Sequence, residues 1–223
     1  PQNPNVVAGD PVTLAMPMPV GPADYDNDGF VDIALPIYGA GGTDFYVVQG
    51  MSDRSFRYFD ISVGDAGLSD PATMFASADI DGDGSNDIVW AGTKAGSPAV
   101  CVLTSKNRMV PTCWTAPAAP SSIIGVDVEG DGKDEVIVGT AGGIDVLRFP
   151  SEGKVESSHL DNDFGSTMTV LDPGRPKPAV WAATRPDGTA IAVFQGTTKK
   201  TIAAKDVILL GGVPVERFQA GIR

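Results

Sequence analysis

The residues of this chain whose types and spacing could do chemistry are acidic, and they lie in three short stretches. The first, DYDNDGFVD, begins at Asp24 and places four aspartates within nine residues. Two carboxylates about 4 Å apart repel each other by roughly 4 kcal/mol at an effective dielectric constant of about 20. A folded chain that keeps them together therefore needs a cation, and oxygen-rich groups of this kind suit Ca²⁺.

The same acidic pattern recurs twice, with a period of about 50 residues. DIDGDGSND begins at Asp79 and DVEGDGKDE at Asp127, and in every copy acids occupy positions 1, 3, 5 and 9 while glycine occupies position 6. Glycine permits the sharp turn that brings the acids together, and the backbone carbonyl of position 7 can add a ligand. The predicted calcium ligands are Asp24, Asp26, Asp28, Phe30 and Asp32 in the first copy, Asp79, Asp81, Asp83, Ser85 and Asp87 in the second, and Asp127, Glu129, Asp131, Lys133 and Glu135 in the third, with Phe30, Ser85 and Lys133 acting through their backbone carbonyls.

Rival interpretations of the pattern are weaker. An EF-hand needs a bidentate Glu at position 12 and flanking helices, whereas position 12 here holds Leu35, Trp90 and Val138. An acidic turn without a metal, capped by its own side chains, could explain one copy but explains three poorly. Mg²⁺ suits the pattern less than Ca²⁺ does, because it keeps several waters and takes few carboxylates.

Between the acidic stretches the sequence has short strand-like segments, about four in each period. The segment after each acidic stretch, such as DIALPI or EVIVGT, is apolar on both faces, which is typical of a sheet packed between two neighbours. The 27 glycines and 18 prolines lie mostly between these segments, as turns require. The prediction is an all-β chain, a β-propeller of four-stranded antiparallel blades in a single domain over residues 1–223. The blades are expected at residues 12–65, 70–118, 120–160 and 165–205.

The fourth predicted blade has lost the acidic pattern. TMTVLDPGRPKPAVWAAT parallels the second copy, with Trp181 in the place of Trp90 and Asp172 in the place of Asp79, but the loop is shorter and its other acids are absent. We expect both tryptophans to pack between blades. The ends of the chain, 1–16 and 206–223, look strand-like and could pair as a composite fifth blade, because closing the ring removes exposed sheet edges.

The pattern D-φ-D-x-D-G-φ-x-D followed by a strand resembles the calcium loop of FG-GAP/VCBS repeats, the blades of integrin-α-type propellers, and fits their bacterial VCBS form best. The resemblance covers the first three predicted blades, with a decayed one at 165–205. It implies about three bound Ca²⁺ ions, each in the loop between the first and second strands of a blade. Propellers of that family usually have seven blades, so this chain could instead be a segment of a larger propeller, completed by another chain or a missing segment.

The two cysteines lie in the segment AVCVLTSKNRMVPTCW. A hairpin folded about Asn107 would put Cys101 and Cys113 nearly opposite each other, where a disulfide could close. The alternative is two buried thiols. A disulfide would favour an oxidising compartment.

Composition and charge count against several classes of function. The formal net charge is −12 and no basic patch stands out, so nucleic acid is not an expected partner. No apolar run approaches the roughly 20 residues that span a bilayer. The single histidine, His159, has Ser157, Ser158 and Asp161 beside it, but neighbours in a loop rarely form a catalytic triad. We therefore expect a solvated loop histidine and no enzyme.

The expected function is a calcium-binding propeller module that acts as a protein- or glycan-binding adhesion scaffold and catalyses nothing. Two alternatives stay open: a propeller segment of a larger secreted toxin or enzyme assembly, and a propeller lectin with sites between blades. Trp114 is the freest candidate for a binding residue, whereas the basic tract 198–205 is expected to be an exposed strand. The chain starts without Met and shows no signal peptide, so we expect a processed protein or an excised fragment that is extracellular, on a cell surface or periplasmic.

Overall fold

The computed structural model describes residues 20–39, 42–61, 74–106, 110–173, 177–203, 208–210 and 213–215. Within these residues the chain forms eighteen strands and no helix. Sixteen of the strands make four antiparallel sheets of four, and in each sheet the strands lie side by side in chain order. The prediction of an all-β chain built from four-stranded antiparallel blades is therefore confirmed.

The four sheets are called blades 1 to 4 in chain order. Blade 1 consists of β1 (Val20–Ala23), β2 (Asp32–Gly39), β3 (Gly42–Gly50) and β4 (Phe56–Ile61). Blade 2 consists of β5 (Met74–Ala78), β6 (Asp87–Lys94), β7 (Ser97–Leu103) and β8 (Thr112–Thr115). Blade 3 consists of β9 (Pro120–Val126), β10 (Glu135–Thr140), β11 (Gly143–Ser151) and β12 (Lys154–Asp161). Blade 4 consists of β13 (Met168–Asp172), β14 (Val180–Thr184), β15 (Ala190–Gln195) and β16 (Thr198–Ala203).

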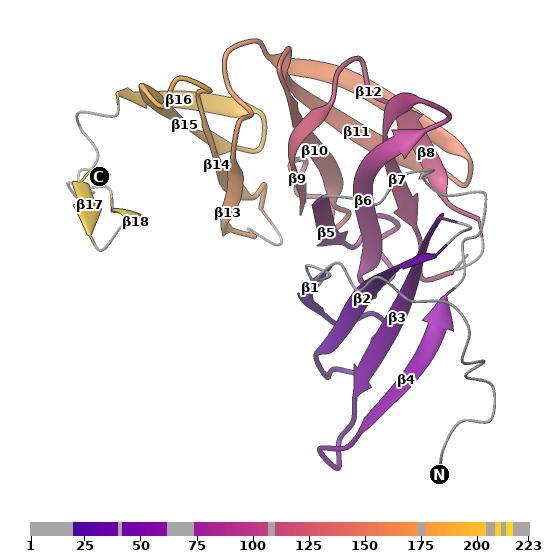
Figure 1. Cartoon of the computed structure of the whole chain (residues 1–223). Helices are drawn as coiled ribbons and strands as arrows, with labels where there is room; N and C mark the ends of the chain where they lie inside the picture. The colour runs from indigo at the N-terminus through magenta and orange to yellow at the C-terminus, as the bar shows by residue number, and fades with distance from the viewer. Residues whose placement is uncertain are drawn as a thin grey trace.

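The blades follow one another along an open arc, with blade 1 at one end and blade 4 at the other (Figure 1). The first strands of neighbouring blades, β1, β5, β9 and β13, contact one another in that order, as in the blades of a propeller. Beyond blade 4, β17 (Ile208–Leu210) pairs with β18 (Val213–Val215). The described sheets do not close into a ring. The composite closing blade predicted from 1–16 and 206–223 falls largely outside the described residues.

Each blade is held to the next by an apolar core between the two sheets. Adjacent residues of a central strand point to opposite sides: in β6, Trp90 packs toward blade 1 and Val89 toward blade 3. In β10, Val138 packs toward blade 2 and Ile137 toward blade 4. All four side chains are fully buried. Each central strand therefore serves two cores, which explains why these segments are apolar on both faces.

Trp90 and Trp181 are both buried between blades, as predicted. Trp90 meets Phe45 edge-on with ring centroids 5.1 Å apart, and Trp181 stacks on Phe194 at 4.0 Å. The two indoles differ in one respect. Trp181 Nε1 donates to the Gly196 carbonyl at 2.9 Å, whereas Trp90 Nε1 has no hydrogen-bond partner among the described residues.

Replacing Trp181 by Phe should therefore cost more stability than replacing Trp90 by Phe. Both changes remove the same part of an indole, but only Trp181→Phe leaves a buried carbonyl without its donor, which costs roughly 1–3 kcal/mol. Urea denaturation of the two variants measures the difference in the free energy of unfolding. Equal losses in the two variants would contradict this expectation.

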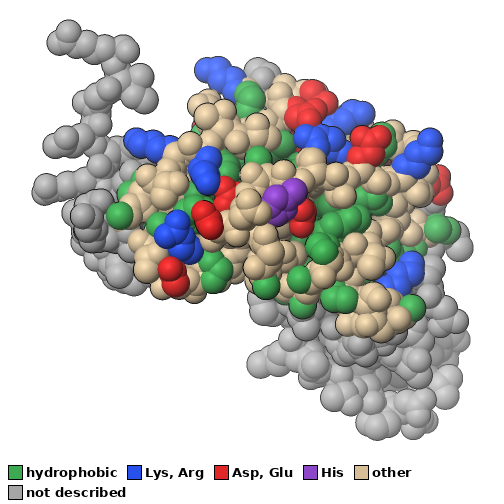
Figure 2. Space-filling view, turned by 90° about the horizontal axis from the view of Figure 1, so that it is seen from above, with side chains coloured by type: hydrophobic (Ala, Val, Ile, Leu, Met, Phe, Trp, Pro, Cys, Tyr) green, Lys and Arg blue, Asp and Glu red, His purple; other side chains and the backbone are tan. Residues whose placement is uncertain are grey.

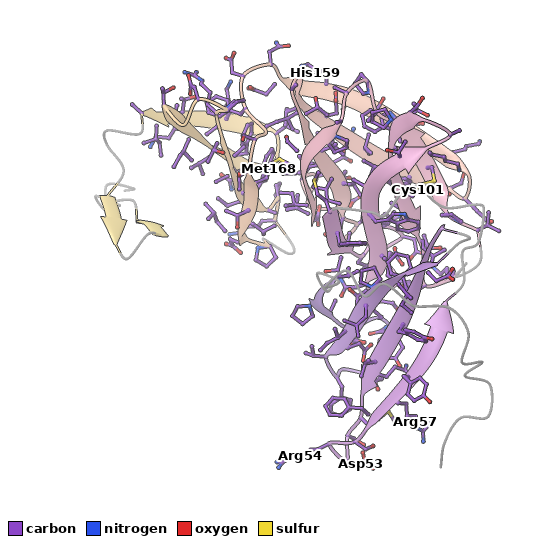
Figure 3. The ribbon with its side chains drawn as sticks, viewed as in Figure 1. Asp53, Arg54, Arg57, Cys101, His159 and Met168 are labelled. Carbon is purple, nitrogen blue, oxygen red and sulfur yellow. A yellow bond between two sulfur atoms is a disulfide. The ribbon has the colours of Figure 1, made fainter. Side chains whose placement is uncertain are left out.

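Cys101 in β7 and Cys113 in β8 lie directly opposite each other in the strand ladder. They form a disulfide, with Cα atoms 4.0 Å apart (Figure 3). The predicted disulfide is confirmed, while the predicted turn residue, Asn107, lies outside the described residues. The bond ties the outermost strand of blade 2 to its neighbour.

The predicted equivalence of Asp172 with Asp79 is wrong. Asp172 is the last residue of β13 and pairs with Val180 of β14, whereas Asp79 follows the end of β5 and opens a loop. A register shift between Val170 and Asp172 keeps this aspartate in the strand ladder. It therefore does not stand where the first metal ligand would be.

Candidate functional site

The three acidic stretches form the loops that join the first and second strands of blades 1, 2 and 3, which is the position expected from the sequence. Loop 1 covers 24–31, loop 2 covers 79–86 and loop 3 covers 127–134. At position 6 of these loops, Gly29, Gly84 and Gly132 have φ angles of 85°, 91° and 91°. This left-handed conformation is open to glycine without steric cost, so the glycine allows each loop to curl.

The acid at position 1 organises each loop through its side chain. Asp79 Oδ1 accepts the backbone N–H of Asp83 and Oδ2 accepts that of Gly84, both at 3.1 Å. Asp24 and Asp127 accept the equivalent pairs of N–H groups in loops 1 and 3. These hydrogen bonds hold the position-1 carboxyl group at the centre of its loop.

In loops 1 and 2 the acids of positions 1, 3 and 5 converge. Within each loop, one carboxylate oxygen from each of the three acids lies within 4.8 Å of the other two. Oxygen ligands about 2.3–2.6 Å from a Ca²⁺ ion lie at most about 5 Å from one another, so these donors fit calcium. The two groups are Asp24, Asp26 and Asp28 in loop 1 and Asp79, Asp81 and Asp83 in loop 2.

Loop 3 has the same turn, but its acid at position 3 is engaged elsewhere. Glu129 Oε1 lies 2.8 Å from Arg148 Nε and 2.7 Å from Nη2. Among the described residues, the acids of loop 3 form no third group with converging oxygens. The structure thus brings six of the predicted acidic ligands together in two groups, and does not bring Asp127, Glu129 and Asp131 into a third.

The acids at position 9 brace the loops instead of joining the groups of three. Asp32 is fully buried and accepts the backbone N–H groups of Tyr25 and Gly50, both at 2.9 Å. In blade 2, Asp87 accepts the equivalent N–H groups of Ile80 and Ser105, and in blade 3 Glu135 accepts that of Val128. Each position-9 acid therefore ties the start of its loop to the second strand of the blade.

The backbone of position 7 also contacts the loop acids. The N–H groups of Phe30, Ser85 and Lys133 donate to the acid at position 5 of their loops, at 2.8, 2.8 and 3.0 Å. These hydrogen bonds hold the N–H side of each position-7 residue, while the carbonyl predicted to bind the metal belongs to the next peptide group. The role of the three carbonyl oxygens stays a prediction.

Burial changes the acid–base behaviour of the bracing carboxyl groups. Loss of hydration raises the pKa of Asp87 and that of Glu135 to about 7. Burial, together with the charge on Asp32, raises the pKa of Asp26 as well. The ionised forms of Asp26, Asp87 and Glu135 are therefore costly, and a nearby cation would lower that cost.

Side chains from the third-strand region of each blade reach the acid at position 3. In blade 2, Lys106 Nζ lies 2.9 Å from Asp81 Oδ2 and 3.5 Å from Asp83 Oδ2. In blade 1 the neutral Gln49 donates to Asp26, and in blade 3 the partner is the arginine of the ion pair described above. In blades 2 and 3 a basic side chain from elsewhere in the blade thus contacts the acids of the loop. The sequence pattern did not predict these contacts.

Each acidic loop is also hydrogen-bonded to the blade that follows it. Between loops 2 and 3 the contact is double, since Asp79 N donates to Asp134 Oδ2 at 2.9 Å and Asp134 N donates to the Asp79 carbonyl at 2.8 Å. The loops therefore form one connected series along the arc. In all three loops the carbonyl of position 1 accepts an N–H from the next blade: Asn86 to Asp24, Asp134 to Asp79, and Ala179 to Asp127.

Replacing Asp134 by Ala should destabilise the contact between blades 2 and 3. The change leaves the Asp79 N–H without its charged acceptor, and hydrogen bonds to charged groups contribute about 1.5–3 kcal/mol. The matched variant Asp134→Asn keeps an acceptor oxygen and should lose less than half of that. Urea denaturation measures the free energy of unfolding of both variants. If Asp134→Ala does not change it, the hydrogen bond between Asp79 and Asp134 contributes nothing to stability.

His159 lies in β12, not in a loop as predicted, and its side chain reaches the surface (Figure 2). Its Nδ1 is 3.0 Å from Asp145 Oδ1 and its Nε2 is 2.9 Å from Asn162 Oδ1. Both ring nitrogens thus face oxygen atoms, and this arrangement favours the protonated imidazole, which has an N–H group for each of them. The hydrogen bond to Asp145 raises the pKa of His159 above its usual value.

The hydrogen bond between His159 and Asp145 should make the free energy of unfolding fall as pH rises. Because the folded-state pKa is raised, its stabilising contribution is fully present below the unfolded pKa of about 6.5 and is lost as pH rises through the folded pKa. NMR titration should place the folded-state pKa of His159 above about 6.5. Asp145→Asn should bring it back down, and a titration unchanged by that variant would contradict the assignment.

Two further predictions concern residues away from the loops. Trp114 lies in β8 and is partly buried against the core between blades 2 and 3, so it is less free than expected. The basic tract forms β16 up to Ala203 and is exposed over most of its length, as predicted.

No helix in the described part of the chain could cross a membrane.

No protein-family model matches this sequence, and no curated protein matches it. Among solved structures, the fold of this chain is similar to that of a lectin from Agrocybe aegerita. That lectin is described as specifically recognising non-reducing terminal N-acetylglucosamine. The two chains are 17% identical with a TM-score of 0.54, and the match covers 82% of this chain and 51% of the lectin. This chain therefore spans about half the length of the lectin, and the likeness shows a shared fold.

Proposed function

We propose that this chain is a non-catalytic, glycan-binding β-propeller module whose acidic loops hold Ca²⁺. The observation that carries the proposal is the pair of converging carboxylate groups on successive blades of a fold shared with a glycan-recognising lectin. The lectin supports glycan binding, and the acidic loops support a metal. The resemblance of these loops to FG-GAP/VCBS repeats makes that family the proposed one.

In each of loops 1 and 2, the carboxylates of positions 1, 3 and 5 would hold one Ca²⁺ ion. The ion would neutralise part of the negative charge of that loop. The chain's own residues supply the rest: position-1 acids hold the turn, and position-9 acids tie it to the following strand. The carbonyls of Phe30 and Ser85 are proposed further ligands. Each ion would cancel two of the twelve net negative charges.

A binding role without catalysis is proposed because the single histidine of the chain is engaged in hydrogen bonds with neighbouring side chains. Both ring nitrogens of His159 are engaged, by Asp145 and Asn162. The disulfide between Cys101 and Cys113 supports a location in an oxidising compartment, so we propose a secreted or surface protein.

A glycan array tests the proposed function. The chain is applied in millimolar Ca²⁺ and again in EDTA, and N-acetylglucosamine-terminated glycans are included because the structurally similar lectin recognises that sugar. We expect binding to a defined set of glycans in calcium and weaker binding in EDTA. An array without any bound glycan in calcium would overturn the lectin function.

A second candidate function, a segment that completes a larger secreted assembly, is favoured by the outer face of blade 1. Ile33, Tyr46 and Tyr58 on that face are 39%, 40% and 68% exposed. The equivalent positions of Ile33 and Tyr46 in blade 2, Ile88 and Cys101, are 3% and 0% exposed because blade 1 covers them. The face thus has the character of a blade–blade interface.

Light scattering tests this second candidate. If another chain covers the face, the protein should be larger than one chain at micromolar concentration, and Tyr58→Arg should reduce its mass. A single-chain mass both for the original sequence and for the variant would exclude self-assembly through the face.

A further inference from the structure

A cavity of about 300 Å³ lies between blades 2 and 3, beside loop 2. Its apolar wall includes Ile80, Val102 and Phe149, and the ammonium-bearing side chains of Lys106 and Lys133 also line it. The volume lies at the lower end of the range typical of small-molecule sites. An apolar wall with a few polar groups is the usual composition of such a site.

The two lysines reach the cavity from different blades. Lys133 belongs to loop 3, and its side chain lies against Gly82 of loop 2: a Cβ added to that glycine would be 3.0 Å from Lys133 Cγ. Lys133 forms no ion pair within the described part of the chain. Its ammonium group is therefore available to an anionic ligand in the cavity.

Lys106 is held by the carboxylates of loop 2. Its ammonium lies against Asp81 and Asp83, two of the three acids that converge in that loop. A divalent cation bound there would take over both carboxylates and repel the ammonium, because like charges a few ångströms apart interact unfavourably even at an effective dielectric constant of about 20. The lysine would then be free to turn to the cavity that it already lines.

The same cation would change the charge balance of the cavity. Two carboxylates, of Asp81 and Glu152, line it together with the two lysines. Neutralising Asp81 leaves an excess of positive charge. Thr112 and Ser151 also line the cavity, and their side chains carry hydroxyl groups that can hydrogen-bond a polar ligand.

We propose that this cavity binds an acidic sugar, with Lys133 and Lys106 contacting the carboxylate of a uronic acid and a cation on loop 2 releasing Lys106 for that contact. The apolar wall accepts the C–H face of the sugar ring and the hydroxyl groups bind its hydroxyls. This inference rests on the proposed function, since it names the glycan class and the place where the glycan binds.

Calorimetric titration of the full chain with methyl glucuronide and methyl glucoside tests the inference, in millimolar Ca²⁺ and in EDTA. The glucuronide should bind about tenfold more tightly than the glucoside, as expected for one charge-assisted contact. Calcium should strengthen binding of the glucuronide alone. Lys133→Met should remove the preference for the glucuronide in EDTA and reduce it in calcium, where Lys106 still contacts the carboxylate. Lys106→Met should remove the effect of calcium, while Lys200→Met on blade 4 should change neither result.

The outcomes separate this inference from the proposed function. Equal affinity for the two sugars would overturn the acidic-sugar assignment, and binding that is insensitive to Lys133→Met would overturn the cavity as its site, while glycan binding on the array would stand. A calcium effect that persists in Lys106→Met would overturn the release of that lysine. If neither sugar binds and the array is also blank, the proposed function fails together with the inference.

Discussion

Calcium is expected to raise the melting temperature of this chain by on the order of 10 °C over its value in EDTA. At free calcium about 100 times Kd, one site stabilises the folded state by roughly 2.7 kcal/mol. Loops 1 and 2 both present converging acids, so two sites would add about 5 kcal/mol. For a chain of this size, each kcal/mol raises the melting temperature by about 2–4 °C. Circular dichroism or calorimetry measures the shift.

Matched variants at position 5 assign the calcium effect to individual loops. Asp28, Asp83 and Asp131 all accept the N–H of position 7 through Oδ1, which asparagine can still do. Asp28→Asn and Asp83→Asn should each remove about half of the calcium-induced shift, because each affects one of two sites, while Asp131→Asn should leave it unchanged. An equal loss in Asp131→Asn would place an ion in loop 3 as well. Identical melting of the original chain in EDTA and calcium would exclude a structural role for the metal.

The second large effect is expected from the disulfide. The double variant Cys101→Ala/Cys113→Ala should lower the free energy of unfolding by about 3 kcal/mol. The bond joins residues 12 apart in sequence, and a cross-link over a loop of this size restricts the unfolded chain by about that amount. Urea denaturation of the variant and of the original chain measures the loss.

Reduction of the original chain provides the control for the double variant. Cys101 is fully buried, so part of any loss could come from a smaller side chain in the core. Reduced original chain keeps both sulfur atoms and should lose most of the same free energy. If the midpoints of the oxidised and reduced chains coincide, the disulfide contributes nothing to stability.

The sequence could predict the loops because their causes are local. Position-6 glycines with left-handed φ angles, and acids that accept N–H groups within the same nine residues, depend on nothing outside the loop. The continuous apolar segments after each loop likewise predicted central strands that pack on both sides. The disulfide followed from strand pairing, in which Cys101 and Cys113 are direct neighbours.

The parts that were missed depend on contacts between distant residues. Lys106 reaches the acids of loop 2 from beyond the end of β7, and Asp134 holds Asp79 across a blade boundary. Neither contact can be seen without the register and the packing of blades. Glu129 fits the acidic pattern as well as an aspartate does, yet its contact with Arg148 takes it out of the convergent arrangement.

Position 9 and the fourth blade show a similar limit. Asp32 was predicted as a ligand from charge and spacing, and that role stays a prediction; its contacts with two backbone N–H groups, which hold the loop to β2, could not be predicted from spacing. Asp172 was aligned by counting residues, but the register shift within β13 keeps it in the strand. The spacing of residues predicts which residue types recur in each blade. The pairing of the strands determines the position of each side chain.

Counting bound calcium by equilibrium dialysis tests the central claim most directly. The claim is that the converging acids of loops 1 and 2 hold Ca²⁺. The chain should bind two ions at micromolar to millimolar free calcium, and Asp28→Asn with Asp83→Asn should abolish binding at both sites. A chain that binds no calcium at millimolar concentration would contradict the account, and so would two ions retained by that double variant.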